Sequence, residues 1–372
     1  MSICSPSRAS ILTGIYPHQH GIVDNYHSFT KSNLGHEFNT AGYATAYFGK
    51  WHMGTQRGSR PGFDRSYSFV GQGEYFDTPF EINGQNTQTK GWVDDLTTNF
   101  VIQELNSINL SNGFFFMIGY KTSHNPWNRS NENVRGLYDG DTSLISPNFN
   151  IKAPYSPNFN GNLHSTRYWK NYQERDRIYF ENITALDRNI GILLDALMTK
   201  DLLKNSLIIF TSDNGIYHGE HGLRDKRTAY EESMRVPLLI MDGGRMVSEK
   251  ITELALNIDI TPTILDYVNI TPKKLTPQGK SLLPFLHHQS EIKWRDQFYF
   301  QYIKEEKYGP FINVEALRTN THKLIVYEDH PKWTELFDLI NDPYETTNIC
   351  TNEELKNKLF NQLTIEKSKI GL

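Results

Sequence analysis

The chain has 372 residues, of which 38% are apolar and 22% charged, and its formal net charge is −4. This composition supports a buried core and excludes a globally disordered chain, and the even charge balance excludes a dedicated nucleic-acid binder. No apolar run is long enough to cross a membrane. From this and from the charge balance we expect neither a nucleic-acid nor a membrane partner. The length predicts a large domain over 1–270 and a smaller one over 271–372.

Apolar runs of strand length alternate with helical patterns through the first two thirds of the chain. Four runs predict strands, at 44–48, 114–118, 207–210 and 236–241. Apolar residues at steps of three and four from Ile183 to Leu197 predict a helix, and a shorter helix is expected over 261–268. This alternation predicts an α/β fold in which helices flank a mostly parallel central sheet.

The pattern changes after about residue 270. Short strand patterns precede a charged helix at the C-terminus, at 297–302, 315–319, 323–327 and 335–339. They predict a small antiparallel sheet with one helix.

Polar side chains follow three of the predicted strands. Lys50 and His52 follow the first, His124 follows the second, and Asp213 and Asn214 follow the third. Ligands of open α/β sheets bind at the carboxyl ends of the strands, so these side chains are candidates for one site. Taken singly, a Lys or His in such a place is more often a surface residue, and Asp-Asn-Gly is a common turn sequence.

The N-terminal segment contains a cysteine at a predicted helix start. Pro6 suits the first turn of a helix, whose free N–H groups favour an anion and lower the pKa of a thiol at Cys4. Arg8 follows one turn later. A lone cysteine here is otherwise read as a small buried apolar residue.

The motif Cys-x-Pro-x-Arg, followed by Ala-Ser-Ile-Leu-Thr-Gly, resembles the formylglycine motif of the type I sulfatases in the alkaline-phosphatase superfamily. Later segments resemble further motifs of that family in the same order: 49–54, 124–127, 212–215, 219–223, Lys226 with 230–233, and 336–345. The resemblance covers nearly the whole chain. It implies an alkaline-phosphatase-like fold and hydrolysis of a sulfate ester.

The resemblance also implies the role of each matching residue. Cys4, oxidised to formylglycine (3-oxoalanine), is expected to be the nucleophile as an aldehyde hydrate. Arg8 is expected to hold that hydrate. Lys50 and His52 are expected to contact its second hydroxyl, with His52 as the base that releases sulfate.

The family resemblance also implies which residues bind the sulfate and the metal. His124 and Lys226 are expected to bind the sulfate, and one of them to protonate the leaving oxygen. Asp213 and Asn214, with the residue formed from Cys4, are expected to ligate Ca²⁺, with Mg²⁺ as an alternative.

Two further pairs have more than one interpretation. His218 and His221 either line the substrate pocket or cap a glycine-rich loop. Glu231 and Glu232 are interpreted as a helix face near Arg235, not as an acid–base pair.

Residues 219–227 are most similar to sulfatases that act on carbohydrate sulfates, including N-acetylglucosamine-6-O-sulfatases. This implies a sulfated carbohydrate substrate, a formylglycine-generating or anaerobic sulfatase-maturating enzyme as partner, and a periplasmic or secreted location. Two alternatives remain open. One is a phosphatase or phosphodiesterase of the same superfamily, and the other is an inactive relative that only binds glycan.

The family begins with a strand that ends in two metal-binding Asp residues and precedes the cysteine. Only three residues precede Cys4 here, so we expect that the sequence is a fragment or begins at a mis-assigned start codon. Asp213 and Asn214 alone cannot complete a site of six or more oxygen ligands. We therefore expect weak or absent hydrolysis by the chain as written.

Overall fold

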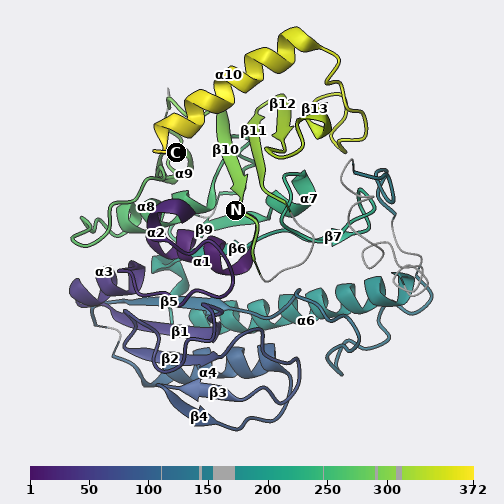
Figure 1. Cartoon of the computed structure of the whole chain (residues 1–372). Coiled ribbons are helices and arrows are strands. Elements are labelled where there is room, and N and C mark those ends of the chain that lie inside the picture. The colour runs from purple at the N-terminus through teal and green to yellow at the C-terminus, as the bar shows by residue number, and fades with distance from the viewer. Residues whose placement is uncertain (110, 142–144, 154–171, 246, 290–291, 307–311) are drawn as a thin grey trace.

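The computed structural model describes residues 1–109, 111–141, 145–153, 172–245, 247–289, 292–306 and 312–372 (Figure 1). The helices of these residues are α1 (Cys4–Thr13), α2 (Pro17–His20), α3 (Leu34–Thr40), α4 (Val93–Ser107), α6 (Tyr172–Thr199), α7 (Glu231–Met234), α8 (Ile260–Tyr267), α9 (Leu283–Leu286) and α10 (Glu353–Lys369). The strands are β1 (Ala44–Lys50), β2 (Arg65–Phe69), β3 (Phe80–Ile82), β4 (Gln85–Thr87), β5 (Phe114–Gly119), β6 (Leu207–Thr211), β7 (Tyr217–His218), β8 (Arg224–Asp225), β9 (Leu238–Asp242), β10 (Gln297–Tyr302), β11 (Val314–Thr319), β12 (His322–Val326) and β13 (Glu335–Asp338).

A five-stranded sheet in the order β4-β3-β2-β1-β5 forms the lower part of the molecule in Figure 1. β1 runs parallel to β2 and β5, whereas β3 and β4 are antiparallel additions. The β3–β4 turn is Asn83-Gly84, both at positive φ, which suits a two-residue hairpin. The predicted α/β fold is confirmed, but the sheet is mixed because its outer strands are joined by connections too short for a parallel crossover.

The two faces of this sheet are covered by different helices. Strand side chains alternate between faces, so Ala46 and Phe48 of β1 pack with residues of α4 and α6, while Tyr47 faces α1. The helix predicted from the Ile183–Leu197 stripe is α6, which begins earlier in the chain. No described helix is long and apolar enough to cross a membrane.

β6 and β9 form a separate two-stranded antiparallel sheet. In the described part of the chain, β5 and β6 each pair with a strand on one side only. The side chains of β6 and most of those of β5 are only half-buried, although both strands are strongly apolar. Within the described ranges, each of these strands therefore has one unpaired edge.

The C-terminal sheet has the order β10-β11-β12-β13 and is antiparallel throughout, as predicted. Helix α10 covers one face, where Leu317 and Leu324 contact Leu359 and Leu363. The opposite face packs against the segment that carries β7, β8 and α7. The C-terminal sheet thus supports the segment that contains Lys226 (Figure 1).

Candidate active site

Cys4 occupies the first residue of α1 and is completely buried. Ile3 is extended and Pro6 lies in the first turn, so the helix starts where the sequence predicts. The chain around Cys4 is held in place because Ser5 donates its hydroxyl to His52 O at 2.5 Å and its N–H to Asn25 Oδ1 at 3.0 Å.

Two lysine ammonium groups converge on the Cys4 sulfur. Lys226 Nζ lies 3.2 Å from Sγ, and Lys50 Nζ lies 3.9 Å from it. Burial raises the pKa of the thiol, but the charges of Lys226 and Lys50, with His52 and His124 beside the sulfur, hold that pKa well below its usual range. The site therefore stabilises negative charge at this position.

Arg8 links the cysteine helix to two strand ends. Its Nε donates to Asp213 Oδ2 at 2.7 Å and its Nη1 donates to Lys50 O at 2.6 Å. Burial alone would raise the pKa of Asp213, but Arg8 and then Lys50 hold it below its ordinary value. Burial also lowers the pKa of Lys50 to about 8. These groups form a buried network at the carboxyl ends of β1 and β6, as open α/β sheets favour.

The two histidines of the site are positioned by residues that the sequence interpretation missed. His52 Nε2 lies 3.0 Å from Gln72 Nε2, and Lys121 Nζ donates to Gln72 O at 3.0 Å. His124 Nδ1 lies 2.7 Å from Asn125 O, and Tyr75 donates its hydroxyl to His124 O at 2.5 Å. Gln72 stands between two glycines directly after β2, which is the one local signal that marks it.

Burial lowers the pKa of both histidines. Lys226 differs, because the negative charge of Cys4 raises its pKa against the effect of burial. The site thus combines neutral imidazoles with a charged ammonium.

Asp213 and Asn214 provide oxygen donors at the end of β6. Asn214 Nδ2 donates to Gly215 O at 2.8 Å, while its Oδ1 is buried and has no hydrogen-bond partner among the described residues. An unpaired buried oxygen beside a carboxylate suits a hard cation such as Ca²⁺. Both residues therefore fit part of a metal site, although they supply too few ligands to complete it.

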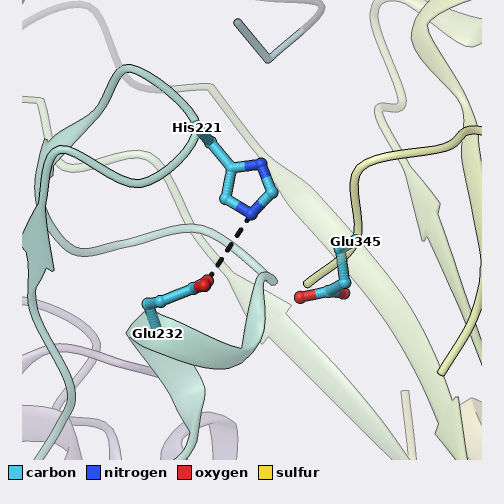
Figure 2. A group of neighbouring side chains, drawn as sticks. All are labelled: His221, Glu232 and Glu345. Atoms are coloured by element: carbon cyan, nitrogen blue, oxygen red, sulfur yellow. Dashed lines mark ion pairs between the residues drawn. The ribbon is translucent and has the colours of Figure 1, made fainter. Parts of the chain in front are cut away.

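His218 and His221 lie in different surroundings. His218 is stacked on Trp127, with ring centroids 4.4 Å apart, and its Nδ1 lies 3.3 Å from Asp176 Oδ1. His221 Nε2 lies 3.1 Å from Asn148 Nδ2 and 3.5 Å from Glu232 Oε2, next to Glu345 (Figure 2). The ring nitrogen of His221 is thus already engaged, and a substrate contact by His221 stays a prediction.

The group of His221, Glu232 and Glu345 has the composition of a metal site, but it already contains a cation. The fully buried Lys323 places its Nζ 2.7 Å from Glu345 Oε1 and 2.8 Å from Glu231 Oε1. An ammonium group at this position offsets the carboxylate charge that a metal would otherwise neutralise. We therefore interpret the group as an ion-pair network.

Glu231 and Glu232 lie on helix α7, as predicted, and Arg235 caps the C-terminal end of this helix. Their carboxylates pair with Lys323 and His221, respectively.

The geometry defines a buried position at residue 4 that faces two ammonium groups, two neutral imidazoles and, through Arg8, a carboxylate at the candidate metal site. Fixed positive groups in a buried site stabilise the charge of a tetrahedral oxyanion and of its transition state. The arrangement suits transfer of an anionic group to a nucleophile at residue 4.

A family profile described as Sulfatase matches residues 1–270. The chain belongs to the sulfatase family. A second profile, described as the C-terminal part of N-sulphoglucosamine sulphohydrolase, matches residues 219–369 of this sulfatase. The family resemblance of the motifs is confirmed, and the chain is a sulfuric ester hydrolase by family.

Individual relatives match this sulfatase over almost all of its length. An N-acetylglucosamine-6-O-sulfatase of Bacteroides thetaiotaomicron is 28% identical, over 99% of this chain and 78% of the relative. The human N-acetylglucosamine-6-sulfatase is 26% identical, over 100% of this chain and 77% of the relative.

A solved structure supports the fold. It is described as a complex with its substrate D-glucosamine-2-N,6-O-disulfate, and it is 26% identical with a TM-score of 0.84, covering 99% of this chain and 88% of that chain. Similarity to solved sulfatases confirms the expected alkaline-phosphatase-like fold.

Proposed function

We propose that this sulfatase removes sulfate from a sulfated carbohydrate, with residue 4 as the nucleophile after oxidation of Cys4 to formylglycine. The single observation that carries the proposal is the buried Cys4 sulfur, which lies within 4 Å of both Lys226 and Lys50. The carbohydrate substrate is supported by the names of the relatives, which include N-acetylglucosamine-6-O-sulfatase. An aldehyde hydrate at residue 4 would supply one hydroxyl to attack sulfur and a second whose deprotonation releases sulfate.

The residues around this position have separate roles in the proposed reaction. Lys226 and Lys50 face the charge that builds on the sulfate oxygens. Burial lowers the pKa of His52, so at neutral pH its ring is ready to accept a proton during sulfate release. Burial and the Lys50 charge lower the pKa of His124, so we assign protonation of the leaving oxygen to the Lys226 ammonium. Arg8 keeps the nucleophile helix against Asp213.

We further propose that Asp213 and Asn214 hold part of a Ca²⁺ site. A hard cation there would neutralise charge on the sulfate oxygens. The remaining ligands would come from a strand outside the sequence, which would pair with the open edges of β5 and β6. Support comes from the half-buried apolar side chains of both strands and from the unpaired Asn214 Oδ1.

Maturation and activity test the proposal together. The chain would be co-expressed with a formylglycine-generating or anaerobic sulfatase-maturating enzyme, and the mass of the Cys4 peptide would report conversion of thiol to aldehyde. Matured protein, with and without an upstream extension and with Ca²⁺, should hydrolyse sulfated N-acetylglucosamine, whereas C4A, treated alike, should not, because alanine cannot be oxidised to the aldehyde. The extended form should be the more active.

Other outcomes would assign the chain differently. Hydrolysis of a phosphate ester but not of a sulfate ester would favour a phosphatase of the same superfamily. Glycan binding without turnover, even by the extended and matured form, would favour an inactive sugar-binding relative. A Cys4 that stays a thiol while a control sulfatase is converted would contradict the proposed nucleophile.

A further inference from the structure

His218 lies in an aromatic slot beside an acid. Its ring is stacked on Trp127 and lies edge-on to Tyr179, with ring centroids 4.4 Å and 4.2 Å away. Its Nδ1 is 3.3 Å from Asp176 Oδ1, and both side chains are largely buried. The other ring nitrogen, Nε2, is buried and has no hydrogen-bond partner among the described residues.

Two separate connections place this ring next to the sulfate-binding residues. Trp127, on which His218 is stacked, donates its Nε1–H to Ser123 O at 2.9 Å. Ser123 directly precedes His124, which faces the Cys4 sulfur. On the other side, His218 pairs with Arg224 across the β7–β8 ladder, two residues before Lys226.

A buried nitrogen without a hydrogen bond lowers the stability of the fold unless a ligand supplies the missing partner. A carboxylate 3.3 Å from Nδ1 favours the tautomer that carries its proton on Nδ1, because the positive end of that N–H then lies next to the negative Asp176. Nε2 is left with a free lone pair and can accept a hydrogen bond from a hydroxyl group.

We infer that His218 is a specificity-determining residue whose Nε2 accepts a hydrogen bond from a sugar hydroxyl near the sulfate ester, and that Asp176 is the positioning residue that sets its tautomer. This inference rests on the proposed function and extends it to one substrate contact. Trp127 and Tyr179 fix the plane of the ring, so the lone pair has one direction. A sugar that lacks the matching hydroxyl leaves Nε2 unpaired and binds more weakly.

Binding measurements test the contact without depending on turnover. Dissociation constants of N-acetylglucosamine 6-sulfate, of its 3-deoxy and 4-deoxy analogues and of methyl sulfate would be measured by calorimetry in the C4A background, in which no formylglycine forms and the sugars are not hydrolysed. One deoxy analogue should bind at least about tenfold more weakly than the parent sugar. The variant H218F keeps a flat ring in the slot and should bind that analogue and the parent sugar about equally.

The role of Asp176 has its own readout. The ¹⁵N chemical shifts of the His218 ring should show the Nδ1–H tautomer in the wild-type protein and a mixture of tautomers in D176N. D176N should also lose part of the discrimination between the sugar and its deoxy analogue. The exposed pair His288 and Glu249, 3.1 Å apart, supplies the matched controls H288F and E249Q. Both controls should leave the ratio of the dissociation constants of the deoxy analogue and the parent sugar unchanged.

The outcomes separate this inference from the proposed function. Equal weakening of all ligands in H218F, methyl sulfate included, would show a packing role only and overturn the inference. Discrimination that survives in H218F would also overturn it. Sugar binding with the expected loss of discrimination, but no hydrolysis by the matured and extended protein, would leave the contact standing and reject the proposed hydrolysis. No binding of any sulfated sugar would reject both.

Discussion

At the scale of single residues, the charge of Cys4 is decided by Lys226 more than by the helix start that the sequence suggests. Burial opposes the thiolate, and the ammonium group of Lys226, 3.2 Å away, is the largest of the effects that together outweigh that cost, followed by Lys50 and the two histidines. K226M should therefore raise the pKa of the Cys4 thiol by about one unit or more. The thiolate ultraviolet absorbance, titrated against pH, measures the shift.

The exposed Lys204, which pairs with Asp201, supplies the control K204M, which should titrate like the wild-type protein. Cys350 does not obscure the reading, because burial raises the pKa of its thiol. An unchanged midpoint in K226M would show that Lys226 does not set the charge of Cys4.

Which site residues the sequence could predict depends on how local their signal is. Cys4 and Lys226 lie in motifs that can be read along the chain, and the structure brings the two side chains together. Gln72 and Asp176 lie far along the chain from the groups they contact, His52 and His218. Their roles depend on tertiary packing, which no local pattern encodes.

At the scale of elements, the end of β1 approaches β5 so closely that only glycine fits. Gly49 has φ 77°, and a Cβ there would lie 2.2 Å from Gly119 O on the neighbouring strand. G49A should therefore destabilise the fold by about 3 kcal/mol, combining left-handed strain with overpacking. Urea unfolding gives the free energy, and sulfatase activity should fall because Lys50 is the next residue.

Gly58 provides the comparison for this substitution. It has a similar φ of 88°, but a Cβ there meets no atom within 4 Å. G58A should cost only the conformational strain, about 1 kcal/mol. Equal losses in the two variants would mean that the contact with Gly119 is not what restricts position 49.

How well the sequence predicts each strand depends on the strand's length and apolar content. β1, β5 and β6 are dense apolar runs and lie where the pattern predicts them. β3 and β4 are three residues each, and β4 has no apolar residue, so both are too short or too polar for periodicity to reveal them. An apolar run also does not predict that β9 is antiparallel to β6, because the direction of a strand depends on the strand with which it pairs.

At the scale of the whole molecule, the C-terminal sheet holds the segment that carries Lys226 through buried polar contacts. Lys323 of β12 pairs with Glu231 of α7 and with Glu345. Nearby, Tyr230 donates its hydroxyl to Glu335 of β13 at 2.8 Å. These contacts join the C-terminal sheet to the helix that follows Lys226, and each of them depends on the protonation of a buried group.

Glu335 makes this interface sensitive to pH. Burial raises the pKa of its carboxyl from 4.5 to about 8, against the hydrogen bonds from Tyr327 and Tyr230. The folded state therefore binds more protons than the unfolded state between these two pH values, so stability falls as pH rises from about 4.5 to about 8 and then levels off. The loss is at most about 1.4 kcal/mol per pH unit for one such group.

E335Q should remove much of that slope, because an amide keeps the shape of the side chain and does not ionise. Urea unfolding at pH 5.5 and at pH 8 measures the difference for both proteins, with the two pH values chosen inside the window set by the raised pKa. The exposed Glu353 on α10 supplies the control E353Q, which should keep the wild-type slope. If E335Q and wild type lose stability in parallel, the pH dependence lies in other groups, and Glu335 is already ionised in the fold.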